Sequence, residues 1–386
     1  MIELRGITWQ HTRGYLPMVA TAQRFQELYP EVHIHWEMRS LQSFADQSIS
    51  QLAERFDFLI IDHPFVGFAA RSNVLLPLDE FLEPHVLEDL AANAVGFSYE
   101  SYRYGGHTWA LPTDTAAPVS GARLDLLAKH GLSKPNTWSE LLELAREGLV
   151  IVPAIPIDSL MHFYMLCLGL GEELFRNRDI VASESVGACA LEMLRALVSL
   201  CDPKCLENNP IATWELMSST DNAAYCPFAY GYSNYARPRY GTKRIDFGGL
   251  IAIDGHEKCR STLGGAGLAI SRTANDVEAA ARYAAFVASP DIQKGIYFDA
   301  GGQPGHRAAW IDPEVNRRSG GFFEHTLETL DAAYMRPRFD VYPAFQDEAG
   351  LIVHAYLIAG GDSGTVVKEL NALLRSVRTR SMEDNQ

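Results

Sequence analysis

The sequence is short of positive charge and has no long apolar run. Its 386 residues include 33 lysines and arginines against 48 aspartates and glutamates, which gives a formal net charge of −15. This excess of negative charge argues against nucleic acids and anionic membrane surfaces as partners. No stretch reaches the about 18 consecutive apolar residues that a membrane-spanning helix needs, so we expect no such helix.

The sequence also lacks several catalytic motifs. It contains no Walker A loop, no G-x-S-x-G, no H-E-x-x-H and no G-x-G-x-x-G after a strand. Gly361-Asp-Ser-Gly364 matches the nucleophile tetrapeptide of chymotrypsin-like proteases, but it directly precedes a predicted helix, where Asp362 or Ser363 serves better as an N-cap. These absences favour a binding protein over an enzyme, and we expect no cofactor.

Cysteine is scarce, at six residues. Cys167 and Cys189 lie in apolar helical patterns and are interpreted as core thiols. Cys201 and Cys205 are close enough in sequence for a local disulfide in an oxidising compartment, and the alternative is two free thiols around the turn at 202–203. Their C-x₃-C spacing is weak evidence for zinc because no second pair follows.

The first part of the chain alternates strand and helix patterns. A short strand is predicted over 4–8, and apolar residues at helical spacing predict a helix over 18–29. Strict alternation predicts a half-buried strand over 32–38, and a helix is predicted over 46–55. The nearly continuous apolar run 56–61 is typical of a central parallel strand. This order predicts a doubly wound α/β sheet.

Turn and capping signals organise the middle and the end of the chain. Gly105-Gly106 between two short strand patterns predicts a hairpin. Thr137-Trp-Ser-Glu140 is a capping box that opens a helix. Apolar stripes predict further helices over 186–200 and 366–377, whereas residues 225–235 are aromatic and turn-prone rather than periodic.

The most informative stretch lies between residues 261 and 305. A glycine-dense turn leads into a predicted strand at 268–270. A helix is predicted over 277–288, with Asn275 as its N-cap. A second helix opens at Ser289-Pro-Asp291, where Pro290 occupies the first helical position.

This order of segments resembles extracellular solute-binding proteins of family 1, the receptors of ABC importers. The resemblance is carried by Leu263-Gly-Gly, Gly267-Leu-Ala-Ile, Ala281, Ala285-Phe286, Ser289-Pro290, Gln293 and the loop Gly302-Gln-Pro-Gly-His-Arg307. The glycine hairpin and Pro135-Asn-Thr-Trp-Ser-Glu140 also fit the family pattern. The usual Tyr-Tyr-Asn after the lobe crossing is replaced by Val119-Ser-Gly-Ala-Arg123, which adds Arg123 as a candidate anion-binding group.

The resemblance implies a two-lobed, periplasmic-binding-protein-like (type II) α/β fold in which each lobe is a mostly parallel sheet flanked by helices. Lobe one would comprise residues 1–113 plus 263–306, and lobe two residues 114–262 plus 307–386. The lobes would close by hinge motion over a small polar organic solute, a sugar or an organic acid. An ABC permease would be the partner of the closed form, and we expect a monomer.

The start of the chain departs from the family pattern. Residues 1–9 have the pattern of a strand and lack the apolar core of an export signal. The resemblance implies a periplasmic protein whose signal has been removed. If Met1 is the natural start, the alternative is a cytoplasmic binding or sensing protein on the same fold. A third alternative is an enzyme that uses the cleft, with Asp114 or His63 as a base.

Candidate ligand-binding residues follow from the rule that ligands of open α/β sheets bind beyond the carboxyl ends of the strands. Indole faces stack on sugar rings, polar side chains fix hydroxyls, and Arg13 could take a carboxylate bidentately. The predicted set is Trp9, His11, Thr12, Arg13, Asp62, His63, Asp114, Thr115, Tyr230, Tyr232, Asn234, Gly264 and Gly265. Structural alternatives are a core role for Trp9, an ion pair for Arg13 and a helix cap for Asp62.

His11, Asp62 and His63 also permit zinc or iron as a minor alternative. The sequence has no H-x-x-x-H motif and lacks the adjacent tyrosine pair of ferric-binding receptors. We therefore expect no metal site.

Overall fold

The chain forms two compact units. The computed structural model describes residues 1–40 and 48–383, so the predicted helix over 46–55 begins outside the described residues. Unit 1 comprises Met1–Ala116, Leu263–Ser319 and Arg338–Asp340, and unit 2 comprises Ala117–Thr262, Gly320–Pro337 and Val341–Gln386. This division differs from the predicted lobes chiefly at residues 307–319, which lie in unit 1.

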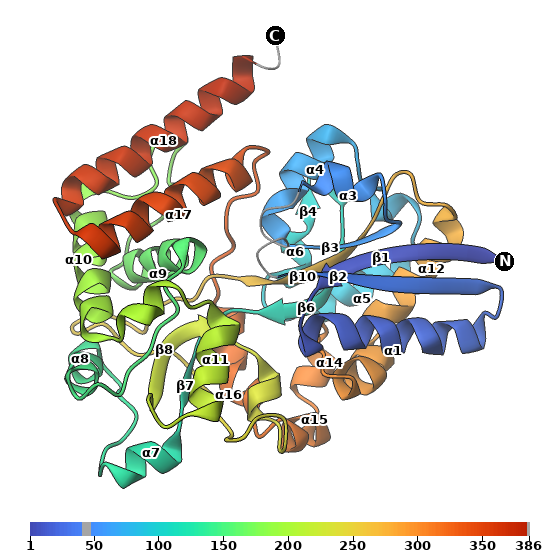
Figure 1. Ribbon diagram of the computed structural model, residues 1–386. Coiled ribbons are helices and arrows are strands. Elements are labelled where there is room, and N and C mark those ends of the chain that lie inside the picture. The colour runs from blue at the N-terminus through green and yellow to red at the C-terminus, as the bar shows by residue number, and fades with distance from the viewer. Residues whose placement is uncertain (41–47, 384–386) are drawn as a thin grey trace. The chain divides into compact units, whose positions relative to one another are not determined.

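Unit 1 is built on a five-stranded mixed sheet (Figure 1). Its strand order is β2 (Val32–Arg39), β1 (Ile2–Trp9), β3 (Phe58–Ile61), β10 (Gly264–Ile270) and β6 (Leu111–Ala116). β1 is parallel to β2 and β3, whereas β10 is antiparallel to β3 and β6. The strands predicted over 4–8, 32–38 and 56–61 are therefore confirmed.

Strand β3 separates two apolar cores because its side chains alternate between the faces of the sheet. Phe58 and Ile60 pack in the core that contains residues of α1 (Thr12–Leu28) and α12 (Val277–Ala288). Leu59 and Ile61 pack in the core that contains residues of α3 (Ile49–Ala53) and α4 (Val66–Ser72). All four residues are buried, which accounts for the unbroken apolar run.

Two local predictions for the segment after residue 261 are corrected. The glycine-dense stretch is part of β10 rather than a turn before it. Asp276, not Asn275, caps α12, because its Oδ1 accepts a hydrogen bond from the backbone N–H of Ala279 at 2.9 Å. The backbone N–H of Asn275 instead donates to Asp57 Oδ1 at 2.7 Å.

Short elements complete unit 1. The predicted glycine hairpin is present as β4 (Arg103–Tyr104) and β5 (His107–Thr108). Helix α13 (Pro290–Ile292) continues into a π-helical turn, η5 (Gln293–Tyr297). The remaining elements are η1 (His63–Phe65), η2 (Leu78–Glu80), α5 (Pro84–Asn93), α6 (Ser98–Ser101), α14 (Arg307–Trp310) and α15 (Pro313–Arg318).

Unit 2 combines a small sheet with long helices. Its sheet has the order β8 (Tyr225–Tyr230), β7 (Pro118–Ala122) and β9 (Asp246–Gly248), and both pairings are antiparallel. This corrects the expectation of a mostly parallel sheet, and β8 corrects the turn-prone interpretation of 225–235. The other elements are α7 (Leu124–Lys129), α8 (Trp138–Arg146), α9 (Pro156–Gly169), α10 (Glu184–Leu200), η3 (Pro203–Leu206), α11 (Pro210–Ser219), η4 (Ser233–Ala236), α16 (Phe322–Asp331), α17 (Tyr342–Ala359) and α18 (Ser363–Glu383).

Two capping predictions in unit 2 are confirmed. Thr137 Oγ1 accepts from the backbone N–H of Glu140 at the start of α8. Asp362 Oδ2 accepts from the backbone N–H of Thr365 at 2.7 Å, so the protease-like tetrapeptide opens a helix. All six cysteines are free thiols, Cys201 and Cys205 among them; Cys167 is buried as predicted, whereas Cys189 is exposed and is not a core thiol. None of the helices in the described part of the chain is both long and apolar enough to cross a membrane.

Helix α9 carries two ionisable side chains into the core of unit 2. Asp158 is 2% exposed and His162, one turn further on, is 1% exposed. Asp158 Oδ2 and His162 Nδ1 have no hydrogen-bond partner among residues 1–40 and 48–383. Burial raises the pKa of Asp158 to about 8 and lowers the pKa of His162 to about 3. Both side chains are therefore neutral in the folded protein near pH 7.

The raised pKa of Asp158 makes the stability of the protein depend on pH. The carboxyl ionises near pH 4 in the unfolded chain, so the stability held by its protonated form is lost as the pH rises from there through about 8. In Asp158→Asn this loss disappears. Between roughly pH 6.5 and 9, the free energy of unfolding should therefore fall by about 2 kcal/mol less than in wild type, as measured by denaturant titration.

Glu143→Gln in α8 is the control, because Glu143 is exposed and its loss should leave the pH profile unchanged. Starting at about pH 6.5 keeps most of the titration of His162 below the measured range, and the remainder is common to wild type and both variants. Identical pH slopes for Asp158→Asn and wild type would show that the carboxyl ionises at its ordinary pKa in the folded protein.

Candidate functional site

The carboxyl end of β1 brings several predicted site residues of unit 1 together. Trp9 ends β1, His11 is the N-cap of α1, and Thr12 and Arg13 are the first residues of that helix. His11 Nδ1 accepts a hydrogen bond from the backbone N–H of Arg13 at 2.9 Å. Thr8 Oγ1 donates to the carbonyl oxygen of Gly14 at 3.0 Å. These two bonds fix the turn from strand to helix.

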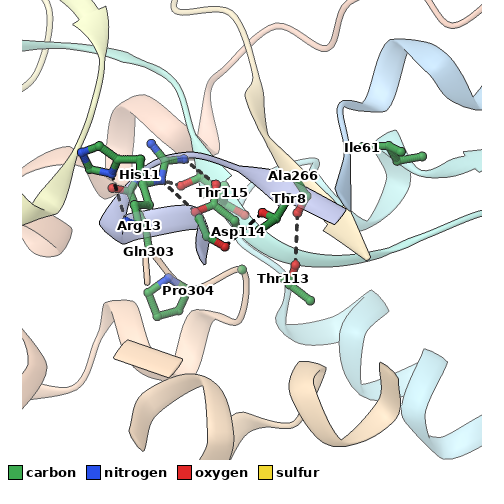
Figure 2. A network of polar contacts seen from close by, with 12 residues as sticks. Thr8, His11, Arg13, Ile61, Thr113, Asp114, Thr115, Ala266, Gln303 and Pro304 are labelled. Atoms are coloured by element: carbon green, nitrogen blue, oxygen red, sulfur yellow. Dashed lines mark hydrogen bonds and ion pairs between the residues drawn. The ribbon is translucent and has the colours of Figure 1, made fainter. Parts of the chain in front are cut away.

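Arg13 and Asp114 form a buried ion pair beside this turn (Figure 2). Arg13 Nε donates to Asp114 Oδ2 at 2.8 Å, and Nη2 donates to Oδ1. The side chains are 4% and 1% exposed. Burial raises the pKa of the Asp114 carboxyl, and the Arg13 guanidinium opposes that shift. The two-bond geometry is that of a charge-assisted pair. The Arg13 side chain therefore forms the structural ion pair that was given as the alternative to binding a carboxylate of the ligand.

Strand β6 and its neighbours hold Asp114 in place. Gly265 lies opposite Thr115 in the β10–β6 ladder, where its φ is +105° and a Cβ would lie 2.3 Å from the carbonyl oxygen of Asp114. Only glycine fits there. Gly264 pairs with Ala116 in the same ladder, and Thr115 is fully buried. The predicted role of the two glycines as an open backbone turn is thus replaced by a role in strand pairing.

The loop before α14 completes this network and was missed among the predicted site residues. Gln303 Nε2 donates to the carbonyl oxygen of Thr115 at 2.8 Å, and the backbone N–H of Thr115 donates to the carbonyl oxygen of Gln303 at 3.2 Å. Gln293 Oε1 accepts from the backbone N–H of Gly305 at 2.8 Å. Tyr297 of η5 lies beside Asp114 and Arg13. The family motif in the sequence contained Gln293 and Gln303, and it was the available signal.

Trp9 and Asp62 have the structural roles that the sequence analysis gave as alternatives to ligand binding, a core residue and a helix cap. Trp9 is 5% exposed and belongs to the α1 core, and a Cβ at Gly14 would lie 2.4 Å from its indole. Asp62 Oδ1 accepts from the backbone N–H of His63 at 2.8 Å and caps η1. His63 is 1% exposed. Asp62 keeps a partly exposed carboxylate at the end of β3.

The electrostatic state of His11 is set by its surroundings. Burial and the neighbouring positive charge of Arg13 lower the pKa of His11 to about 3. The ring is half-buried, and Figure 2 shows it directed away from Asp114. His11 is therefore a neutral imidazole at the edge of the sheet.

The predicted residues of unit 2 follow strand β8. Tyr230 ends β8 and its hydroxyl lies 3.4 Å from Thr262 Oγ1. Tyr232 and Asn234 lie at η4, where they are 5% and 0% exposed. The structure thus gathers these residues within one unit.

Residues of the C-terminal segment also approach Tyr230, and sequence reasoning missed them. Tyr342 lies near Tyr230, Tyr334 and Arg336. Arg336 is 3% exposed and its Nη1 donates to Gln346 Oε1 at 2.8 Å. No motif or periodicity in the sequence marked this cluster, because its members lie more than a hundred residues after Tyr230 in the chain.

Arg123 is not an anion-binding group. Its side chain is fully buried and pairs with Asp125 and Asp221. It also donates to the carbonyl oxygens of Met217 and Thr220. All four partners lie in unit 2, so the side chain has a structural role. In the described part of the chain, no group of three or more His, Cys, Asp and Glu side chains is placed to hold a metal ion.

Comparison with known proteins supports the resemblance seen in the sequence. Residues 8–160 match the family model described as bacterial extracellular solute-binding protein, and the predicted family resemblance is confirmed. The two-unit α/β fold is shared with solved ABC-transporter binding proteins over nearly the whole chain, so the predicted α/β fold class is confirmed, apart from the mostly parallel sheets corrected above.

Three solved structures illustrate the shared fold. Maltose-bound MalE3 of T. maritima has a TM-score of 0.86 at 20% identity, covering 98% of this chain and 100% of that chain. An ABC transporter solute-binding protein of Agrobacterium radiobacter in complex with ribitol has a TM-score of 0.83 at 17% identity, with coverage of 97% and 98%. One from Thermotoga lettingae bound with α-D-tagatose has a TM-score of 0.83 at 18% identity, with coverage of 98% and 100%.

The buried ion pair should be costly to break. Asp114→Asn leaves the Arg13 guanidinium buried without its carboxylate, and losses of about 3 to 5 kcal/mol are typical of such changes. We expect a loss of this size in the free energy of unfolding, measured by denaturant titration. The double variant Arg13→Met/Asp114→Leu should recover part of it, because no buried charge is left.

Glu37→Gln supplies the matched control. It breaks the pair between Arg5 and Glu37 in the same sheet, whose side chains are 49% and 48% exposed, and exposed pairs contribute about 1 kcal/mol or less. Equal losses for Asp114→Asn and Glu37→Gln would contradict a special role for the buried pair.

Proposed function

Given the match to bacterial extracellular solute-binding proteins and the shared fold, we propose that this chain is the solute-binding receptor of an ABC importer. It captures a small polar organic solute, a sugar, polyol or organic acid. The observation that carries the proposal is the likeness to T. maritima MalE3, which covers 98% of this chain and 100% of that chain. The likeness therefore spans both units of this chain and is not confined to one of them.

The chemistry of the predicted site supports a polyhydroxylated solute. The solved proteins of this fold carry maltose, ribitol and α-D-tagatose in their own sites, and all three compounds present several hydroxyl groups. In this chain, the carboxyl edge of unit 1 offers the imidazole of His11 and the carboxylate of Asp62. Unit 2 offers the phenol of Tyr230. Such groups donate to and accept from hydroxyls.

The same proposal includes a partner, a membrane permease, and a place of action outside the cytoplasmic membrane. The receptor works outside the cytoplasmic membrane and delivers its solute to a membrane permease. It acts as a monomer and by binding, without catalysing a reaction. Asp114, which the sequence offered as a candidate base, is held by both nitrogen contacts of Arg13, and this supports binding over catalysis.

A solute panel tests the proposal. Maltose, ribitol, D-tagatose and D-mannitol are added to the purified protein, and the midpoint of thermal unfolding is measured. A solute present at a hundredfold over its Kd should stabilise the folded protein by about 2.7 kcal/mol, which raises the midpoint by several degrees. Trimethylamine N-oxide, an osmolyte without hydroxyl groups, controls at equal concentration for general co-solvent effects. If no member of the panel raises the midpoint more than this osmolyte does, the proposal for sugars and polyols fails.

Hinge closure is a further part of the proposal. The chain passes between the units at five points, after Ala116, Thr262, Ser319, Pro337 and Asp340, so relative motion of the units requires backbone changes near these positions. A solute that favours a closed form should reduce the radius of gyration measured by small-angle X-ray scattering. Saturation with a panel member that binds, without any change in the scattering curve, would contradict closure.

A further inference from the structure

Two polar side chains of α9 enter the core of unit 2 from neighbouring turns. Asp158 and His162 are four residues apart, and such positions of a helix lie on the same face, one above the other. Both residues are buried. The ring of Phe228 in β8 lies 4.6 Å from the imidazole of His162, measured between centroids. The thiol of Cys226 in the same strand lies close enough to Asp158 to interact electrostatically with its carboxyl. The two side chains are therefore enclosed within one unit.

The two side chains present a donor and an acceptor. A backbone hydrogen bond to Phe228 favours the charged form of His162, so a ring N–H donates to the carbonyl oxygen of Phe228. Nδ1 has no partner among the residues that the structure describes, which places that N–H on Nε2 and leaves Nδ1 with a lone pair. Asp158 Oδ2 is likewise unpartnered within the described residues, and burial raises the pKa of its carboxyl to about 8. Near pH 7, Asp158 is therefore a carboxylic acid that can donate its proton.

These two atoms need a partner that the described side chains do not supply. A buried polar atom that gives up its bonds to water and forms none in the protein is costly. Neither atom forms a hydrogen bond with the other. Ordered water joins such atoms inside proteins, provided that it finds at least two polar partners. Asp158 and His162 supply one partner each.

We propose that Asp158 and His162 form a buried binding site for one water molecule, which accepts a hydrogen bond from the carboxylic acid and donates one to Nδ1 of the imidazole. A ligand at this site must both accept and donate, which water does and an ammonium ion cannot do. The bridge ties the first turn of α9 to the second and holds the proton on Asp158. Since the site lies inside unit 2, it does not depend on the proposed receptor function.

A high-resolution crystal structure of the full chain near pH 7 tests the site directly. We expect one water oxygen within about 3.2 Å of both Asp158 Oδ2 and His162 Nδ1. Asp158→Asn keeps an amide donor and should keep the water, whereas Asp158→Leu should lose it. A direct bond between the two side chains, or a wild-type core without a water between them, would overturn the inference.

A double-mutant cycle measures whether the two side chains share a partner. Asp158→Leu and His162→Phe each remove one partner of the water and leave the other polar group buried without one. In the double variant neither polar group remains, so its loss of stability should be smaller than the two single losses combined. The ionisation of each group in the unfolded chain is removed with that group and cancels in the cycle. We expect the product of the two single-variant unfolding constants to exceed the product for wild type and the double variant by about tenfold, measured by denaturant titration.

Asp158→Leu combined with Thr326→Val is the matched control cycle. Thr326 is also buried in unit 2, but its hydroxyl donates to the carbonyl oxygen of Phe322 in its own helix at 2.7 Å. The two changes should therefore be independent, and the two products should be equal. Equal products in the cycle with His162→Phe would show that Asp158 and His162 share no partner, which contradicts the proposed site. The wild-type crystal structure decides the question even if a core variant does not fold.

Discussion

The ion pair between Arg13 and Asp114 is the interaction on which the candidate site of unit 1 depends. It joins the first turn of α1 to β6 across 101 positions of sequence, and both side chains are removed from water. Since a buried charge without its partner is costly, the two elements cannot separate cheaply. The cap of His11, the pairing of Gly265 with Thr115 and the contacts of Gln303 are all arranged around this link. These contacts together hold the first turn of α1 against β6.

Much of unit 1 could be predicted from the sequence because its strands have simple surroundings. Apolar and polar residues alternate in β2, which is typical of a strand with one buried face. β3 is continuously apolar, which is typical of a strand covered on both faces. The prediction was wrong for β10 and β8, whose glycine or aromatic content is not typical of a strand. β10 begins with glycines that allow close contact with β6, and these residues have the composition of a turn. β8 is rich in tyrosine and contains a proline, so its periodicity is weak even though most of it is buried.

The candidate site was less predictable than the fold, for a physical reason. The strand-end rule located His11, Asp62 and Asp114 because position along a strand can be read locally. It could not show that Arg13 faces Asp114 rather than solvent, since that depends on a contact between distant segments. For the same reason Gln303 and Tyr297 were not identified as neighbours of the Asp114 segment, nor Tyr342 as a neighbour of Tyr230 within unit 2. Local patterns name elements, whereas the partners of a side chain are set by tertiary packing.

The position of β10 in the sheet has a consequence for the order in which the chain is made. This strand lies between β3 and β6, yet it is translated about 200 residues after β3. Until β10 has been synthesised, the backbone edge of β3 that faces β10 has no strand to pair with. The five-stranded sheet cannot form before then. Unit 1 must therefore fold after most of unit 2 has been synthesised, although it contains the first residues of the chain. During this interval the edge of β3 that will pair with β10 is unpaired, and an unpaired strand edge can pair with another chain.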